Sequence, residues 1–323
     1  MPLKTTHIIA FTNQKGGCGK TTTTVSLAAA CASLGYKVCV VDTDPQCNAT
    51  DSFALDRDKL AEEGKFTIAD AMLAKRPAKD MEHDFQDRFD GNLFVIPGHK
   101  GLGTVSQRLE GQLQSAIAEG KYSDLDIDDL KNEHRQRLRK SLESLRGERD
   151  LIFIDTPPDL GFLMTTALLA ADWYVIPVFP SGYDLKGLEA LSRNVQKVQQ
   201  RFNPRLQLIG VLLGNTDARA KLDFDIHAML VQSFGKERVF KTVINRSVKH
   251  REATVYGQTI FEHAGEQPAA EQFLEVAKEL IKRLEKAEAG KGSQGTVPAP
   301  EPLTAMSDEA EEPLLQEANR GNF

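Results

Sequence analysis

A glycine-rich loop near the start of the chain constrains the fold more than any other feature. Residues 13–22 read Asn-Gln-Lys-Gly-Gly-Cys-Gly-Lys-Thr-Thr. They end in the Gly-Lys-Thr of the phosphate-binding loop template, although Gln14 stands where that template has its first glycine. The apolar residues 7–12 before the loop predict a buried strand, and residues 22–34 after it predict a helix. A strand, a glycine loop and a helix in this order are the setting in which such a loop binds phosphate.

Each residue type in the loop has a part in phosphate binding. Glycines let successive backbone N–H groups turn toward phosphate oxygens. The charge of Lys20 can reach the outer phosphates, and the hydroxyl of Thr21 can ligate magnesium. A simple glycine turn that opens a helix is the alternative, which the strand–loop–helix order disfavours. The residues expected to bind the nucleotide are Gly16, Gly17, Cys18, Gly19, Lys20, Thr21 and Thr22.

Carboxylates follow two further apolar runs. Residues 37–41 lead into Asp42 and Asp44 of an Asp-Thr-Asp-Pro-Gln segment, and residues 151–154 lead into Asp155, which Thr-Pro-Pro follows. A carboxylate at a strand end beside a phosphate site can hold a magnesium-bound water or orient an attacking water. One such aspartate alone could be a turn or a helix cap. Their order along the chain favours a nucleotide site with Asp155 near magnesium.

The extra lysine, Lys15, makes the loop resemble the deviant Walker A motif of the ParA/MinD family of ATPases. In that family this lysine reaches across a nucleotide-sandwich homodimer to the phosphates of the partner subunit; a solvated surface lysine is the alternative reading. The D-x-D-P-Q and D-x-P-P elements are similar to those of the same family. The resemblance implies ATP and Mg²⁺ as cofactors. It also implies catalytic roles for Lys15, Lys20 and Asp44, and metal-binding roles for Thr21, Asp42 and Asp155.

The rest of the chain alternates predicted strands and helices. This order favours an α/β fold with a doubly wound, mostly parallel sheet and helices on both faces. The further predicted strands are 92–97, 173–178, 207–213 and 239–244, and the further predicted helices are 163–171, 185–202, 223–234 and 269–284. In the last helix, the stripe Phe273, Val276, Leu280 and Leu284 is expected to pack in the core.

The resemblance covers about residues 7–286. It implies that Asn215 lies near the adenine, since the family builds part of the base pocket at this strand end. Residues 243–253 resemble the family's V-I-P-R-N-V-R-x-x-E-A segment, with Asn245 in place of proline and Lys249 in place of arginine. Basic residues of this region help ParA-type dimers to bind nonspecific DNA. The residues expected to contact DNA are Arg246, Lys249 and Arg251, with His250 in the same basic group.

Composition and charge suggest one large domain followed by a tail. A chain of 323 residues with 41% hydrophobic content can bury a large core, so residues 1–289 are predicted to form the ATPase domain, with a charged expansion at about 101–149. Residues 290–323 are predicted to be a disordered acidic Gly/Pro-containing tail. Within them, residues 301–323 hold six acidic residues and one arginine, so the body carries little of the net charge of −6. The basic residues of the expansion, Lys131, Arg135, Arg137, Arg139 and Lys140, are interpreted as a solvated helix face, with contact to a partner or to DNA as the alternative.

The cysteines and the apolar runs bear on the cellular compartment. Cys18, Cys31, Cys39 and Cys47 form no C-x-x-C pair, so neither a disulfide framework nor a zinc site is predicted. No stretch reaches the length of a membrane span, and no signal peptide is evident. A cytoplasmic protein without membrane attachment is expected.

The resemblance to ParA/Soj proteins implies an ATP-dependent dimer that binds nonspecific DNA and partitions plasmids or chromosomes. A ParB-like partner would stimulate hydrolysis, and the ATP-bound form would be nucleoid-associated. Three alternatives remain open: positioning of a protein cargo such as a chemoreceptor cluster or carboxysome, a MinD-like membrane ATPase, and a dethiobiotin-synthase-like ligase. The acidic end of the sequence disfavours the second, and Lys15 with the D-x-D-P-Q element disfavours the third.

Overall fold

A single sheet organises the chain, of which the computed structural model describes residues 3–118, 124–180, 185–217 and 219–290. The eight strands stand in the order β3-β4-β2-β5-β1-β6-β7-β8, and only β3 pairs antiparallel with its neighbour. The strands are β1 His7–Phe11, β2 Val38–Asp42, β3 His83–Asp84, β4 Leu93–Ile96, β5 Leu151–Asp155, β6 Trp173–Val178, β7 Gln207–Thr216 and β8 Ile244–Asn245.

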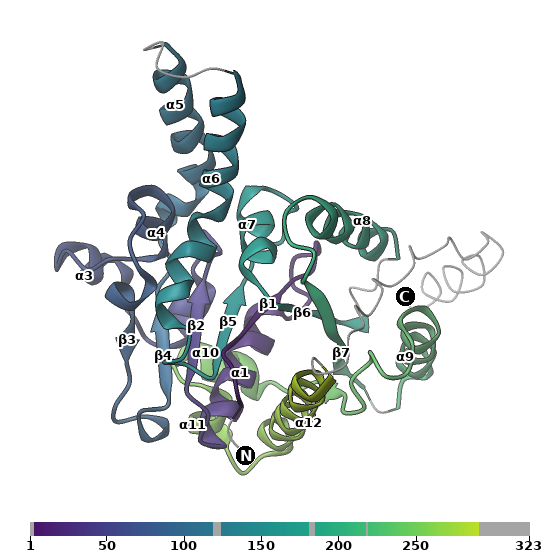
Figure 1. Cartoon of the computed structure of the whole chain (residues 1–323). Coiled ribbons are helices and arrows are strands. Elements are labelled where there is room, and N and C mark those ends of the chain that lie inside the picture. Colours follow the sequence, from purple (N-terminus) through teal and green to yellow (C-terminus); the bar gives the residue numbers. More distant parts are fainter. Residues whose placement is uncertain (1–2, 119–123, 181–184, 218, 291–323) are drawn as a thin grey trace, which may run out of the picture.

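Helices connect these strands along the whole chain (Figure 1). The α-helices are α1 Lys20–Ser33, α2 Asn48–Ser52, α3 Arg57–Glu62, α4 Ile68–Ala74, α5 Val105–Ala118, α6 Asp124–Leu142, α7 Phe162–Ala170, α8 Leu185–Arg201, α9 Lys221–Phe234, α10 Lys249–Val255, α11 Ile260–Ala264 and α12 Pro268–Gly290. The 3₁₀ helices are η1 Ala78–Met81, η2 Phe89–Gly91, η3 Lys100–Thr104 and η4 Glu143–Leu145.

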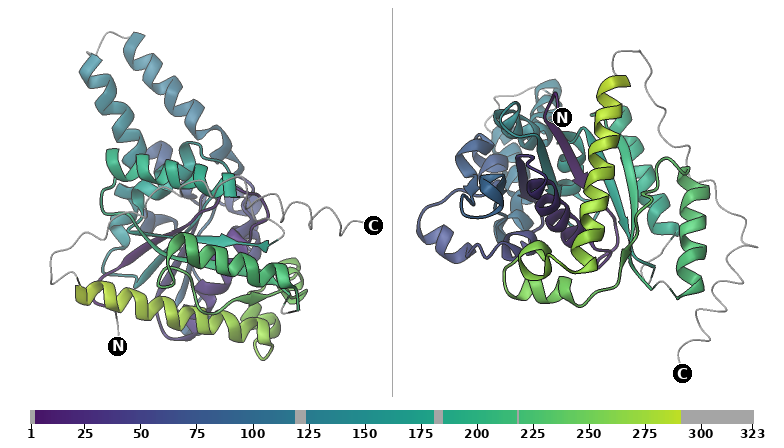
Figure 2. Two further views of the ribbon diagram at one scale, coloured as in Figure 1. Left: turned by 90° about the vertical axis from the view of Figure 1, so that its right-hand side faces the viewer. Right: turned by 90° about the horizontal axis from the view of Figure 1, so that it is seen from below.

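Side chains of the longer strands alternate between two cores, one on each face of the sheet. In β1, Ile8 and Ala10 join the core that α4 to α9 cover, whereas Ile9 and Phe11 join the core beneath α1 and α12. Strands buried on both faces are continuous apolar runs, as a parallel sheet requires. Figure 2 shows α12 lying across the face that α1 also covers. The predicted fold class, a doubly wound and mostly parallel sheet, is confirmed.

The predicted stripe on α12 is also confirmed as core. Its four apolar side chains are almost completely buried on the α1 side of the sheet, and Pro268 begins the helix as its fixed φ favours. The helix runs six residues beyond the predicted end, to Gly290. The predicted tail otherwise lies outside the described residues.

Helices α5 and α6 form the charged expansion and project from the body as a pair (Figure 1). The interpretation of its basic residues as a solvated face is wrong for Arg137, which is buried at the base of this pair. Its Nη1 donates hydrogen bonds to the backbone oxygens of Met72 (2.8 Å) and Leu73 (3.3 Å) at the end of α4. These carbonyls have no helical partner, and the guanidinium satisfies them.

The predicted strand 239–244 is wrong except for Ile244, which begins the two-residue β8. Val239 forms only an isolated bridge with Val211. Side chains of α12 occupy the backbone groups that a longer strand would use: Arg283 Nη2 donates to the Val239 oxygen (2.8 Å), and Glu279 accepts from the Lys241 N–H (3.0 Å). Tertiary contacts therefore override the strand propensity of this apolar run.

The end of α7 rests on one buried amide, from which we predict a measurable stability effect. Asn203 Nδ2 donates to the backbone oxygens of Leu168, Leu169 and Ala171 at 3.0, 3.1 and 2.7 Å. Because Asn203→Ala leaves buried carbonyls unsatisfied, it should lower the free energy of unfolding by about 1–3 kcal/mol in chemical denaturation. Gln200→Ala, an exposed change on the neighbouring helix, should have little effect. Equal stability of the two variants would contradict the assignment.

Candidate nucleotide-binding site

The glycine loop connects β1 to α1 in a conformation that glycine permits. Gly17 and Gly19 have φ values of +73° and +85°, in the left-handed region that disfavours other residues. A Cβ added at Gly16 or Gly17 would meet nothing within 4 Å, so open space lies in front of this part of the loop. Gly19 directly precedes the 14-residue helix α1. The unpaired N–H groups at this helix start favour an anion.

The ring of Phe179 packs against the end of the loop. A Cβ on Gly19 would lie 2.2 Å from its Cζ, and a Cβ on Gly214 of β7 would lie 3.0 Å from its Cε1. Close packing therefore requires glycine at both positions, and backbone conformation requires it at Gly19 as well. Phe179 follows β6 directly, and the sequence analysis did not identify its role.

Internal hydrogen bonds hold the loop in shape. Lys20 is buried, and its Nζ donates to the Lys15 oxygen at 3.1 Å. Cys18 Sγ also donates to this oxygen, at 3.1 Å. Asn13 accepts from the Lys15 N–H (3.1 Å) and donates to the Pro177 oxygen (2.7 Å), which ties the loop to β6. The sequence analysis overlooked Asn13, although a polar residue between a buried strand and a glycine loop could have identified it.

Lys15 stands apart from these contacts. Its side chain is exposed, and its ammonium group has no hydrogen bond or ion pair to any residue that the structure describes. The two lysines of the loop therefore differ: Lys20 turns into the protein, and Lys15 extends away from it.

The sheet brings the predicted carboxylates to the loop. Asp42 and Asp155 are direct neighbours across β2 and β5, and both are fully buried at the strand ends. Asp155 accepts hydrogen bonds from the hydroxyls of Thr21 (2.7 Å) and Thr24 (3.3 Å) on α1. Burial and, to a smaller extent, the neighbouring Asp42 together raise the pKa of Asp155 to about 8. The structure thus joins Thr21 and Asp155, both predicted at magnesium.

Asp42, a residue predicted at the metal, accepts three hydrogen bonds from neighbouring residues of the protein. Its Oδ2 accepts from the N–H (2.8 Å) and hydroxyl (2.7 Å) of Thr50, and its Oδ1 accepts from the Asp44 N–H (3.1 Å). Burial raises its pKa to about 6, and these donors oppose the rise. Asp42 therefore holds the segment from Asp44 to Thr50 against the sheet. Thr50, which the sequence analysis did not identify, also accepts from the Gly98 N–H at 2.8 Å.

Asp44 lies at the start of this segment. It is 6% exposed, and its Oδ1 accepts from the Gln46 N–H at 2.9 Å. The other carboxylate oxygen has no hydrogen bond to the described residues, which leaves it available to a water.

The donor set fits a magnesium ion that is held with a nucleotide. Among the described residues, no group of three His, Cys, Asp or Glu side chains is placed to hold a metal without further ligands. Mg²⁺ is usually bound through one or two protein oxygens, waters and substrate phosphates. Thr21 at the start of α1 and Asp155 at the end of β5 match this pattern.

A pocket of about 400 Å³ adjoins α1 beside the loop. Thr22 and Thr23 line it on one side, and Asn215 and Asn245 line it on another. Asn215 has a φ of +55° at the irregular end of β7, a conformation that asparagine tolerates better than most residues. The structure therefore places Asn215 and the start of α1 around one cavity beside the phosphate loop.

The basic group around α10 divides between this pocket and the surface. His250 faces inward: its ring packs edge-on against Phe273 at 5.5 Å, and both ring nitrogens are buried without a hydrogen bond. Burial lowers its pKa, so the ring of His250 differs in its surroundings from the other members of the predicted basic group. Arg251 is exposed but also lines the pocket, and Lys249 pairs with Glu252 at 2.8 Å.

Comparisons of the sequence identify related proteins. Residues 6–208 match a family model described as an AAA domain. The chain is 33% identical over 277 residues to the chromosome partitioning protein ParA of Myxococcus xanthus, which covers 86% of this chain and 88% of that protein. It is 34% identical over 273 residues to the sporulation initiation inhibitor protein Soj of Bacillus subtilis (84% and 97%). It is 35% identical over 280 residues to the chromosome-partitioning ATPase Soj of Thermus thermophilus (86% and 97%).

Solved structures share the fold. A cobyrinic acid a,c-diamide synthase from Mycobacterium smegmatis, with bound ATP analogue and magnesium, superposes with a TM-score of 0.68 at 24% identity, covering 87% of this chain and 97% of that one. The septum site-determining protein MinD of Pyrococcus horikoshii, complexed with Mg-ADP, gives 0.62 at 21% identity, covering 90% and 100%. Within the described residues, none of the helices combines the length and apolarity needed to span a membrane.

The buried carboxylates predict a pH effect on stability. A carboxyl whose pKa is raised on folding keeps a proton that the unfolded chain releases. In the absence of nucleotide and magnesium, its contribution to the free energy of unfolding therefore falls as the pH rises from about 4 to about 8. Denaturation titrations of the wild type and of Asp155→Asn should show a shallower decline for the variant. Parallel pH profiles would contradict a raised pKa at Asp155.

Proposed function

The chain belongs to the ParA/Soj family of chromosome-partitioning ATPases, and on this premise we propose that it is an ATP-dependent DNA-binding switch. In this proposal ATP and Mg²⁺ drive a homodimer, and the dimer binds DNA without reading its sequence. Hydrolysis then releases the DNA. Such a switch would partition plasmid or chromosomal DNA, and it would be associated with the nucleoid while ATP is bound.

The exposed Lys15 is the observation that carries the dimer proposal. The phosphate loop already contains a second lysine, Lys20, which is turned inward beside the loop backbone. An unpaired ammonium group at the open side of the loop is available to phosphates bound by a second copy of the chain. We propose that Lys15 stabilises transition-state charge in the partner's site, whereas Lys20 acts within its own subunit.

The residues around the strand ends fit ATP hydrolysis. Thr21 and Asp155 would hold magnesium, with Asp42 supporting its waters and the segment beside it. When bound, the ion neutralises charge on the outer phosphate oxygens. The loop residues 16–22 and the α1 start would hold the phosphates, and Asn215 would lie at the base. Asp44, with a free carboxylate oxygen beside this edge, would orient the attacking water.

The proposed DNA contacts lie next to the nucleotide pocket. Arg246 is exposed, and its backbone N–H is fixed to the Thr216 oxygen of β7 at 2.8 Å. With Lys249 and Arg251 it gives a short segment of three cations. Phosphate contacts of this kind position a protein on DNA and carry no sequence information. A ParB-like, centromere-bound or adaptor protein would then accelerate hydrolysis.

Nonspecific DNA binding in different nucleotide states tests the proposal. We expect binding with ATP or a slowly hydrolysed analogue, little binding with ADP or no nucleotide, and an affinity that falls as salt rises. Arg246→Ala should lower the affinity and reduce the salt dependence by about one phosphate contact, whereas Lys278→Ala, which removes an exposed cation on α12, should not. In Asp44→Ala, ATP-dependent binding should persist because hydrolysis is lost.

Failure of this test would have a definite meaning. Protein that binds and hydrolyses ATP but ignores DNA in every nucleotide state, even at low salt, would contradict the DNA-binding switch. It would favour a relative that acts on a small molecule or a membrane. Normal ATP turnover by Asp44→Ala would contradict the role given to that residue alone.

Lys15→Ala should separate nucleotide binding from hydrolysis. Because Lys20 and the loop backbone remain, equilibrium titration with a fluorescent ATP analogue should show retained binding. Steady-state turnover should fall by about 10- to 1,000-fold, the scale expected for loss of a charge that stabilises the transition state. Lys37→Ala, an exposed lysine before β2, is a suitable control. Unchanged turnover in Lys15→Ala would show that the exposed lysine is only a solvated surface residue.

A further inference from the structure

A second cavity, of about 530 Å³, lies at the end of the sheet opposite the phosphate loop. Its walls come from residues 5–7 before and at the start of β1, from Asp172 and Trp173 at the start of β6, and from residues 203–207 before β7. Arg139 near the end of α6 and Glu143 at the start of η4 complete it. Because these parallel strands all begin here, the cavity is separate from the nucleotide site at their carboxyl ends.

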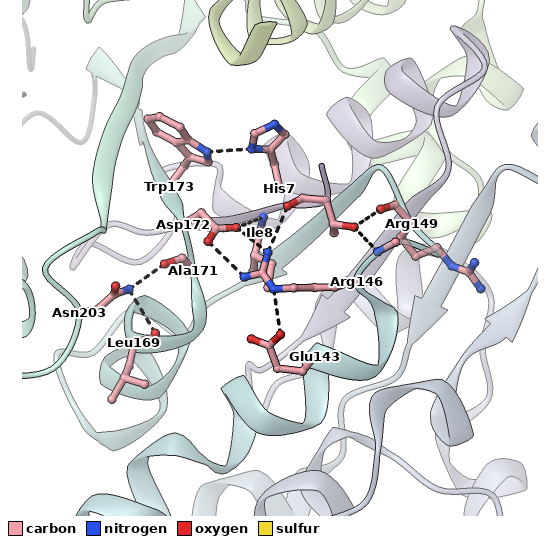
Figure 3. Close-up of polar contacts among 12 residues, drawn as sticks. His7, Ile8, Glu143, Arg146, Arg149, Leu169, Ala171, Asp172, Trp173 and Asn203 are labelled. Atoms are coloured by element: carbon pink, nitrogen blue, oxygen red, sulfur yellow. Dashed lines mark hydrogen bonds and ion pairs between the residues drawn. The ribbon is translucent and has the colours of Figure 1, made fainter. Parts of the chain in front are cut away.

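The acidic groups of the cavity already have partners, as Figure 3 shows. Arg146 lies between them: its Nη2 is 3.1 Å from Asp172 Oδ1, and its Nε is 3.2 Å from Glu143 Oε2. Asp172 Oδ2 also accepts from the Ile8 N–H at 2.9 Å. The two carboxylates of the cavity are therefore already paired with a cation of the protein.

Three other arginines, two in the lining of the cavity and one on α6 next to it in sequence, form no ion pair with a carboxylate of the described residues. Arg139 is half-buried and Arg205 is exposed, and both line the cavity. Arg135, one turn before Arg139 on α6, packs over the ring of Phe202 with its guanidinium carbon 5.2 Å from the ring centre. We call Arg135, Arg139 and Arg205 the arginine rim. It offers several unpaired guanidinium groups to an anionic ligand.

The chain leaves α12 beside this cavity. Glu288, two residues before the end of α12, accepts from the N–H groups of Lys4 and Thr5 at 3.0 Å each. His7 Nε2 lies 3.0 Å from the same carboxylate, and His7 Nδ1 accepts from Trp173 Nε1 at 3.1 Å. Figure 2 shows the start of the chain next to this end of α12. The residues after Gly290 therefore begin next to the wall that residues 5–7 form.

We propose that the acidic segment 301–317 of this same chain binds to the arginine rim. Residues 301–317 contain no lysine or arginine, and their acidic residues are Glu301, Asp308, Glu309, Glu311, Glu312 and Glu317. The acidic segment thus follows α12, which ends next to the cavity that carries the arginines. This inference does not depend on the DNA-binding proposal, because the rim and the nucleotide site lie at opposite ends of the sheet.

The intervening chain is long enough to permit this contact. From Gly290 to Asp308, 18 residues separate the end of α12 from the main acidic cluster. A flexible linker of this length has a root-mean-square span of about 25 Å. A tether of this size gives an effective concentration in the millimolar range. Several exposed ion pairs, each weak alone, then suffice to hold the segment for much of the time at low salt.

Limited proteolysis of the full-length protein tests the contact. Under brief exposure to a nonspecific protease, we expect residues 301–317 to be cut slowly at low salt and faster at high salt, because salt screens the ion pairs. Arg139→Glu/Arg205→Glu should raise the cleavage rate at low salt about fivefold or more. The control Arg108→Glu/Lys197→Glu makes the same charge change at exposed positions that do not belong to the rim, and it should cleave like the wild type. Arg205→Glu alone repeats the test with a fully exposed side chain.

Reversing the charges of both the arginine rim and the acidic segment tests whether these two contact each other. Glu309→Arg/Glu311→Arg/Glu312→Arg in the Arg139→Glu/Arg205→Glu background should restore slow cleavage and its salt dependence. Equal cleavage rates in all variants would overturn the proposal. Lost DNA binding in Arg139→Glu/Arg205→Glu with unchanged cleavage would also overturn it, by assigning the rim to nucleic acid. Thermal unfolding of each variant establishes that it is folded.

Discussion

Two carboxylates buried side by side fix the positions of the segments at the carboxyl ends of the central strands. Asp42 and Asp155 end adjacent parallel strands, where burial disfavours their charged forms. Hydroxyl and N–H donors offset this cost, and they come from two separate segments of the chain. Thr21 comes from the phosphate loop, and Thr50 comes from the segment that carries Asp44. The buried pair therefore holds two segments in place at this edge of the sheet: the end of the phosphate loop and the segment that carries Asp44.

The anchoring explains why much of the site could be predicted from the sequence. Strand ends in a parallel sheet lie on one edge, so the order of the loop and aspartates along the chain was enough to bring Thr21 close to Asp155. Asn13 and Thr50 were missed because their role depends on where the chain turns, which neither periodicity nor spacing encodes. Phe179 was missed because only the structure shows it against Gly19.

The errors of prediction and the surroundings of His250 share one physical cause, namely competition from side chains of other elements. Residues 239–243 have the composition of a strand, yet Arg283 and Glu279 take their backbone groups. Arg137 has the charge of a surface residue, yet carbonyls at the end of α4 bind it. His250 stands among cations in the sequence, but the helix turns its ring toward Phe273. Long-range partners of this kind cannot be inferred from one sequence without its fold.

Helix α10 gives the proposed switch a physical basis. The segment from Ile244 to Val255 lines the pocket beside α1, yet it also exposes Arg246 at the surface. Both ring nitrogens of His250, within this segment, are buried without hydrogen bonds, an arrangement that costs free energy unless a partner arrives. A base in the pocket would contact the same short helix that positions the cations. In the proposed function, nucleotide binding and the proposed DNA contacts then involve the same segment, residues 244–255, so coupling them requires no long pathway through the protein.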